Sequence, residues 1–152
     1  MNRQRVRLSL HIKHPARDLS GVCRAIGLEP KHIWKRGDER QTPKGRKLGG
    51  LRESSYCSID LGFSLGLSER ERLPEQIEAA LTLLRPHEPM LRELSSAGGR
   101  ISFYVGWFCD EDTGETLGVQ LMESMARMGI ALDLLIYFPD PPELESEADA
   151  AD

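Results

Sequence analysis

Residues 5–13 read RVRLSLHIK and alternate strictly between polar and apolar side chains. A period of two is typical of a β-strand with one buried and one solvated face. The aliphatic side chains of this stretch would therefore face a core, and the polar ones would face water. Because a parallel sheet covered on both faces has continuous apolar strands, the alternation favours a sheet with helices on one face and solvent on the other.

Three further segments, residues 54–61, 100–109 and 132–138, alternate in the same way. Their expected inward side chains are Cys57, Ile59 and Leu61 in the first, Ile101, Phe103, Val105 and Trp107 in the second, and Leu132, Leu134, Ile136 and Phe138 in the third. The alternation therefore predicts four strands in this chain. All three of its tyrosines, Tyr56, Tyr104 and Tyr137, fall on the outward face of these strands.

Helical patterns separate the predicted strands. One would begin after Asp18 as N-cap and end at Gly27, where glycine allows a left-handed stop. A second would begin at Pro74 and break at Pro86, before a short helix over residues 89–95.

A further helix is expected before the last strand. Asp112 and Glu115 have the spacing of a capping box, and Gly129 would end the helix that they begin. We thus expect an α+β two-layer sandwich, with a four-stranded mixed sheet and helices on one face, as a single domain over residues 1–138. Residues 139–152 hold six acids and three prolines, which predicts a disordered acidic tail.

Composition narrows the class of protein. The chain has 152 residues, of which 39% are hydrophobic and 29% charged, and it has no apolar run near the ~20 residues of a membrane helix. The apolar stretch behind the N-terminal arginines is too short for a signal peptide. The three cysteines Cys23, Cys57 and Cys109 lie at core positions, which predicts reduced buried thiols. We therefore expect a cytoplasmic protein with no membrane association.

Charge is divided unevenly along the chain. Residues 1–52 hold 14 Lys and Arg against 4 acids, whereas residues 53–152 hold 6 Arg against 20 acids. Such an asymmetry can steer an oppositely charged partner, or it can hold two parts of one fold together.

Several of these features together resemble one family. A strand and helix end in Gly27-Leu28-Glu29-Pro30, followed by Trp34-Lys35-Arg36-Gly37-Asp38 and the strand at Ser54-Ser55-Tyr56. The proline-broken helix pair and the closing stretch over residues 128–133 continue the likeness. In this order they resemble the bacterial family known as domain of unknown function 4279, over about residues 6–138. Tyr56 stands where that family would have tryptophan. The resemblance implies a bacterial or phage cytoplasmic protein of this architecture, and it supplies no catalytic residues.

Two motifs invite a catalytic or metal-binding interpretation. Residues 62–66 read GFSLG, the pattern of a hydrolase nucleophile elbow, but no aspartate lies between Ser64 and His87 and a charged stretch follows the motif. The carboxylates of residues 110–115 do not fit an EF-hand, because Gly114 stands at the fifth position. We interpret both as turns and predict no catalytic residue, metal site or cofactor.

The basic segment, residues 31–52, is the most distinctive stretch. We expect a long loop with cations gathered around one indole; its candidate binding residues are Trp34, Lys35, Arg36, Arg40, Arg46 and Lys47. Basic side chains beside an indole could bind RNA or a nucleotide. They could equally dock on an acidic protein, or form a solvated loop.

The outward face of the sheet is the other candidate site. Its proposed partner-binding residues are Arg7, His11, Tyr56, Tyr104 and Tyr137. Exposed tyrosines are typical of protein interfaces, although they also shield the backbone of open sheets.

Three functions remain open at this point. The first is a non-catalytic binding protein with a protein partner, by analogy a toxin-immunity protein. The second is RNA or nucleotide binding through residues 31–52. A small enzyme of unknown class is the third, and we expect no enzyme because no nucleophile and base can be aligned. The sequence leaves partner identity and oligomeric state open.

Overall fold

The computed structural model describes residues 4–139, so the predicted disordered tail lies, apart from Pro139, outside the described residues. The strands are β1 (Arg5–His14), β2 (His32–Trp34), β3 (Glu39–Gln41), β4 (Lys47–Leu51), β5 (Ser55–Asp60), β6 (Arg100–Phe108) and β7 (Ile130–Tyr137). The α-helices are α1 (Ser20–Ile26), α2 (Leu61–Ser64), α3 (Leu73–Leu84), α4 (Glu88–Ser96) and α5 (Val119–Met128).

The main sheet has five strands in the order β2-β5-β1-β6-β7. β1 pairs antiparallel with β5 and β6, β2 pairs antiparallel with β5, and β6 pairs parallel with β7. The mixed α+β class is therefore confirmed, and the number of strands is corrected from four to five. Three residues of β2 are too few to show a period of two, so the sequence pattern missed this edge strand.

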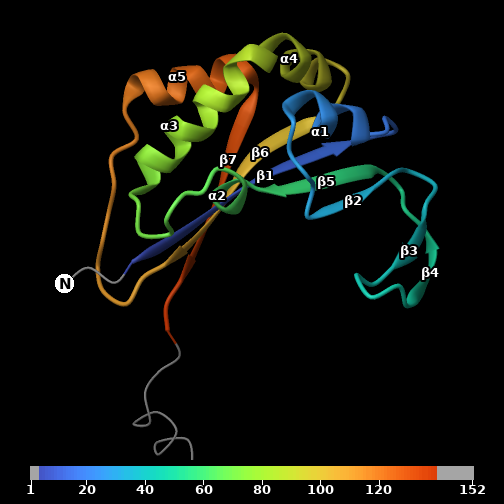
Figure 1. The fold of residues 1–152 in the computed structure, drawn as a ribbon, viewed down its shortest axis with the longest axis horizontal. Helices are drawn as coiled ribbons and strands as arrows, with labels where there is room; N and C mark the ends of the chain where they lie inside the picture. The colour runs from blue at the N-terminus through green and yellow to red at the C-terminus, as the bar shows by residue number, and fades with distance from the viewer. Residues whose placement is uncertain (1–3, 140–152) are drawn as a thin grey trace, which may run out of the picture.

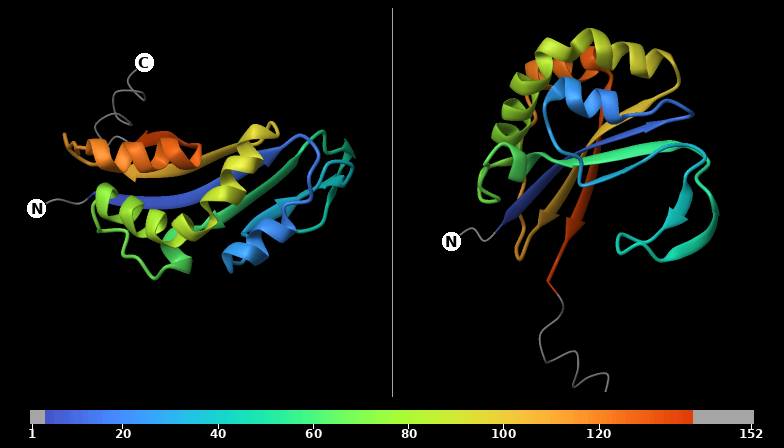
Figure 2. Two further views of the ribbon diagram at one scale, coloured as in Figure 1. Left: turned by 90° about the horizontal axis from the view of Figure 1, so that it is seen from above. Right: turned by 45° about the vertical axis from the view of Figure 1, so that its right-hand side comes forward.

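Alternation places one side of the sheet in the core. Val6, Leu8, Leu10 and Ile12 are at most 1% exposed, whereas Arg7 and Lys13 of the same strand are exposed. In Figures 1 and 2, α3, α4 and α5 lie over the sheet on one side. The three central strands β1, β5 and β6 therefore bury their aliphatic side chains and present the alternate ones on what we call the polar face.

Prolines determine where α3 begins and where it is separated from α4. Pro74 lies in the first turn of α3, where its missing N–H costs nothing, and α3 buries one face that includes Ile77 and Leu81. Pro86 interrupts the helix with a short 3-10 turn before α4 begins at Glu88. These boundaries lie within one or two residues of those expected.

The predicted capping box is wrong. α5 begins only at Val119, after Gly118, and no side chain caps it. Glu115 instead accepts hydrogen bonds from Arg72, with Oε2 at 2.7 Å from Nη2. The ion pair ties the connection before α5 to the start of α3. Gly129 ends the helix in the left-handed conformation, as expected, with φ of 74°.

The expected burial of the last strand is also wrong in part. Leu134 is 43%, Ile136 51% and Phe138 68% exposed, although their phase matches the core side. β7 is an edge strand of the sheet, and its C-terminal half extends beyond the cover of α5. Alternation predicts which side a residue faces, but not whether a helix covers that side.

The basic segment is not the loop that the sequence predicted. It contains β2 and a separate two-stranded hairpin, β3 with β4. The turn is closed by Arg46 N–H, which donates to Thr42 Oγ1 at 3.0 Å, and Gly45 adopts φ of 88°. In Figure 1 the hairpin projects from the β2 end of the sheet, on the side away from the helices.

Within residues 4–139, no helix combines the length and the apolar character needed to span a bilayer.

Candidate functional site

Aromatic side chains cross the polar face from one edge of the sheet to the other. We call this set the aromatic row; its members are Trp34 on β2, Tyr56 on β5, His11 on β1, Tyr104 and Phe108 on β6, and Tyr137 on β7. Since every strand of the main sheet contributes a ring, the alternation of all five strands builds the row together.

His11 lies at the centre of the row. Its ring stacks on Tyr104, with centroids 4.5 Å apart and planes inclined by 15°, and meets the edge of Tyr56 at 5.6 Å. Ser58 and Ser102 flank it in register, and among the described residues their buried hydroxyls form no hydrogen bond of normal geometry. Partial burial lowers the pKa of His11, a shift that the Asp133 carboxylate opposes. The imidazole at the centre is therefore biased towards its neutral form.

An ion pair lies beside this centre. Arg100 donates from both Nη atoms to the two carboxylate oxygens of Asp133, at 2.9 and 3.1 Å. The pair is bidentate, and the hydrogen bonds from Arg100 lower the pKa of Asp133. Both charges are thereby committed within the chain, so this part of the face offers ring edges and hydroxyls rather than free charge.

The β7 end of the row is a second stack. Phe108 and Tyr137 are parallel to within 16°, with centroids 4.9 Å apart. The guanidinium groups of Arg5 and Arg7 lie 5.0 and 5.1 Å from the Phe108 centroid, and both pair with Glu69. The Tyr104 side chain is hydrogen-bonded to Tyr137 and so connects the centre of the row to this end. The hydrogen bond raises the pKa of Tyr104.

Glycine makes room for that stack. A Cβ at Gly106 would come within 3.4 Å of the Phe108 ring and 3.8 Å of the Tyr137 ring. The gap in the alternation at Gly106 therefore has a packing reason, since the two flanking rings occupy the space above it.

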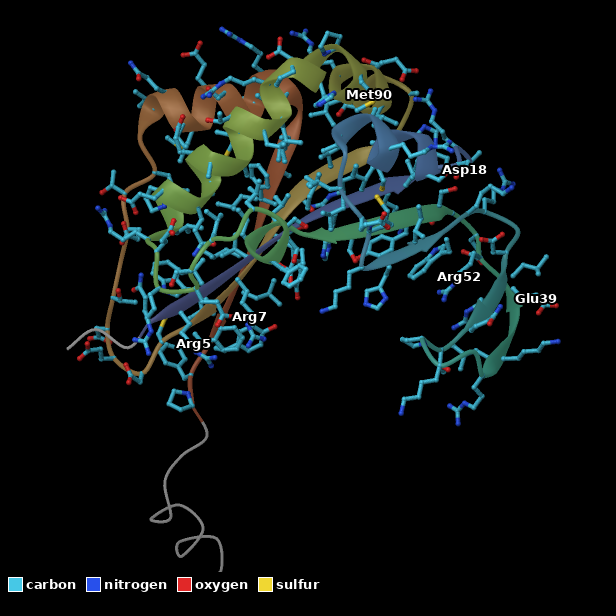
Figure 3. All side chains as sticks on the ribbon, viewed as in Figure 1. Arg5, Arg7, Asp18, Glu39, Arg52 and Met90 are labelled. Atoms are coloured by element: carbon cyan, nitrogen blue, oxygen red, sulfur yellow. The ribbon has the colours of Figure 1, made fainter. Side chains whose placement is uncertain are left out.

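The β2 end of the row opens into a cleft of about 920 Å³ between the sheet and the hairpin. Its lining residues are Lys31, His32, Ile33, Trp34, Asp38, Glu39, Gln41, Thr42, Pro43, Arg52 and Tyr56. The Trp34 and Tyr56 rings contact each other with centroids 4.7 Å apart. Arg52 lies over Trp34, with its guanidinium carbon 3.7 Å from the ring centroid. Figure 3 shows Arg52 beside the hairpin and Arg5 and Arg7 at the far end of the sheet.

The cations around this cleft are largely unpaired. Lys47 pairs with Glu39 at 3.7 Å. Within the part of the chain that the structure describes, the other seven cations of the segment form no ion pair; these are Lys31, Lys35, Arg36, Arg40, Lys44, Arg46 and Arg52. Three arginines of the helical side contrast with them, because Arg72, Arg85 and Arg127 each have a carboxylate partner. The segment therefore carries most of the free positive charge near the polar face.

The structure brings four of the predicted site residues together. Tyr56, His11 and Tyr104 form one cluster, and Trp34 of the basic segment joins it, so two candidate sites are continuous. Arg7 lies apart from that cluster, at the Phe108 end. The predicted cations lie in two places: Lys35 and Arg36 follow β2, and Arg40, Arg46 and Lys47 lie in the hairpin.

Sequence reasoning missed the Arg100–Asp133 ion pair of the site, and it also missed Phe108 and Arg52. Phe108 has the outward phase of its strand, two positions after Gly106, so the alternation could have found it. Arg52 was one basic residue among many, and no pattern distinguishes it. Its stacking on Trp34 depends on the path of the hairpin between them.

The serine motif and His14 have local structural roles. Residues 61–64 form the short helix α2, capped by Asp60, whose Oδ1 accepts from Phe63 N–H at 3.0 Å. His14 points away from His11, is buried, and accepts backbone N–H groups of Ala16 and Arg17. Within residues 4–139, no group of three or more His, Cys, Asp or Glu side chains has the arrangement of a metal site.

The cysteines are free and buried, as expected from their positions. The Cys23 thiol, on α1, is hydrogen-bonded to Cys57 of β5, and this contact together with burial raises the pKa of Cys57. The two thiols thus pack as small apolar groups between a helix and the sheet.

A family model described as Domain of unknown function (DUF4279) matches residues 4–139. The chain belongs to the DUF4279 family. The match covers all five strands of the sheet, the hairpin and the helices, so the polar face and the cleft of this DUF4279 protein both lie inside it. No curated protein and no solved structure matches the chain.

Proposed function

We propose that this DUF4279 protein is a non-catalytic binding protein that engages a protein partner through its polar face. The observation that carries the proposal is the aromatic row, which crosses all five strands. The proposal requires the helices to cover one face of the sheet only. Tyrosine and tryptophan offer rigid area with a polar tip, a combination that protein interfaces favour.

The orientation of the rings favours a protein over a nucleic acid. A base stacks only where a ring has a free face. Here His11 and Tyr104 each cover one face of the other, and Trp34 has the Arg52 guanidinium over its ring and Tyr56 beside it. These contacts reduce the ring faces open to a base, whereas ring edges and hydroxyls suit hydrogen bonding and packing by a protein surface.

Charge supports an acidic partner. Residues 31–52 hold eight Lys and Arg against two acids, and most of these cations lack a partner within residues 4–139. We propose a cytoplasmic role as an immunity protein, which binds and blocks a toxin domain; the warrant is analogy with small binding domains of this kind.

The test replaces Tyr56, Tyr104 and Tyr137 together by alanine. Partners captured by the wild-type protein are identified by mass spectrometry, and each is purified and retested by calorimetry. We expect binding to weaken at least about tenfold, because exposed aromatic side chains dominate interface energies. Arg92→Ala on α4 is the control and leaves affinity unchanged. Two-dimensional NMR spectra verify the fold, and equal affinity of a folded triple variant would remove the proposal.

The immunity role has its own test. Co-expression with a toxin encoded beside this protein should restore growth, and the triple variant should not. Growth inhibition that persists with the wild-type protein rejects immunity against that toxin, without touching partner binding itself.

A second candidate, RNA or nucleotide binding through residues 31–52, is favoured by the unpaired cations of that segment. It predicts that a labelled single-stranded RNA binds at low salt and dissociates as salt rises, because phosphate contacts release counterions. Fluorescence anisotropy measures this, and unchanged anisotropy at low salt ends the candidate.

A further inference from the structure

We infer that the cleft between β2 and the hairpin binds an extended acidic segment of a protein, with Arg52 as its principal carboxylate contact. The inference rests on the proposed binding function and assigns one part of the partner to one part of the surface.

Arg52 has donors to spare. It is held over Trp34 at 3.7 Å, and its Nη2 donates to the carbonyl oxygen of Gln41 at 3.3 Å. Its Nε is buried and has no hydrogen-bond partner among residues 4–139, and no carboxylate of those residues pairs with the group. A guanidinium has five N–H donors, and a carboxylate engages two of them at once. Arg52 is thus a positioned cation that lacks an anion.

The acids of the cleft do not supply that anion. Glu39 pairs with Lys47, and Asp38 Oδ2 accepts the backbone N–H of Lys35 at 2.8 Å. Lys31 also lines the cleft and has no ion pair in the described chain. The unpaired cations therefore attract an acidic ligand, and several carboxylates in a row satisfy more of them than one does.

The walls of the cleft favour an extended backbone. One wall is β2 with the preceding residue, and the other is β3 with the turn that follows it. β2 is the edge strand of the main sheet, so its outer side has no neighbouring strand within residues 4–139. An edge strand presents unpaired N–H and C=O groups, to which an extended peptide can add as a further strand.

The probe is a labelled peptide of alternating Glu and Thr, about twelve residues long, which matches the alternation of a strand. Its matched control alternates Gln and Thr, and single-stranded oligouridine of about the same length tests the competing class of ligand. Binding to the full chain is measured by fluorescence anisotropy at two salt concentrations. We expect the acidic peptide to bind, binding to weaken with salt, and the neutral peptide to fail.

Variants locate the site. Arg52→Gln should weaken binding of the acidic peptide about tenfold, the loss of one bidentate pair. Arg52→Lys keeps the charge without the planar fork and should lie between the two. Arg92→Gln on α4, an exposed arginine with no ion pair in residues 4–139, should bind as the wild type does. If Arg52→Gln does not fold, Arg52→Lys decides the matter through its intermediate affinity.

Three results would overturn the inference: equal binding of the neutral peptide, no effect of either Arg52 variant, or tighter binding of oligouridine than of the acidic peptide. Failure here is distinguishable from failure of the proposed function. A natural partner that depends on Tyr104 and Tyr137 but not on Arg52 leaves the function standing. If the acidic peptide binds at Arg52 but the triple tyrosine variant still binds its partner, the proposed function fails and the inference about the cleft stands.

Discussion

The imidazole ring of His11 stacks on the phenol ring of Tyr104, 4.5 Å between centroids and 15° from parallel. The two residues lie on neighbouring antiparallel strands, where His11 pairs with Ser102 and Ser9 pairs with Tyr104. The contact is therefore diagonal, and it joins the centre of the aromatic row to the Arg100–Asp133 pair. His11 is in this way sensitive to charges on two strands.

Asp133→Asn should lower the pKa of His11 further. The Asp133 carboxylate favours the imidazolium, whereas burial and Arg100 oppose it, so removal of the carboxylate leaves only the opposing influences. Titration of the His11 ring by NMR measures the shift, with the resonance assigned by its loss in His11→Gln. A His11 pKa that rises in Asp133→Asn would contradict the geometry.

Stability should follow the same titration. Because the pKa of His11 is lower in the folded state, the unfolded chain binds the proton more readily. The free energy of unfolding should therefore fall as pH drops from neutrality through the ordinary histidine range, and His11→Gln should reduce this slope. Urea unfolding at a series of pH values measures it, and an unchanged slope would show that His11 does not contribute.

Phe103→Ala should destabilise the fold by about 3–5 kcal/mol, the usual cost of emptying a buried phenylalanine site. Phe103 is 0% exposed on the core side of β6. Phe63→Ala is the matched control, since Phe63 is 86% exposed on α2 and should change stability by less than about 0.5 kcal/mol. Urea denaturation compares them, and equal losses would contradict the burial of β6.

Gly129→Ala should cost about 1–3 kcal/mol, because φ is 74° there and a Cβ would lie 2.6 Å from the Ser95 hydroxyl oxygen. Gly118→Ala, at the other end of α5, is the control. It has an extended backbone with φ of −65°, and a Cβ there meets nothing within 4 Å. Thermal unfolding should separate the two variants clearly, and a Gly129→Ala variant as stable as Gly118→Ala would rule out the steric cause.

Arg52→Ala should loosen the base of the hairpin. Arg52 N–H donates to the carbonyl of Asp38 at 2.8 Å, and its carbonyl accepts from Gly37 N–H at 2.9 Å. Loss of the cation–π contact, about 1 kcal/mol, should speed exchange of these amides about fivefold with little effect on the core. Arg46→Ala at the hairpin turn is the control. Unchanged exchange at Gly37 would mean that Trp34 does not hold the hairpin.

Much of the fold could be predicted from long regular patterns. The four long strands were found because each has at least six residues, enough to show the alternation of its two faces. β2 was missed because three residues carry no period, and the hairpin because its side chains are nearly all exposed. The start of α5 was predicted wrongly from the apparent capping box, because Glu115 instead pairs with Arg72 across the fold.

The site could be predicted only in part. Strand phase alone puts Tyr56, Tyr104 and Tyr137 on one face, whatever the strand order. That Trp34 lies against Tyr56 depends on which strand neighbours β5, a fact that no local pattern contains. The position of Arg52 over Trp34 depends in addition on the return path of the hairpin, which is set by tertiary contacts.

The two tryptophans of the chain occupy contrasting environments. Trp107 is 6% exposed in the core, whereas Trp34 lies in the wall of the cleft beneath Arg52. The emission of Trp107 should stay constant as long as the protein is folded, while that of Trp34 depends on the cation above it. The protein therefore contains its own optical reporter, and occupancy of the cleft can be followed in unlabelled material by intrinsic fluorescence.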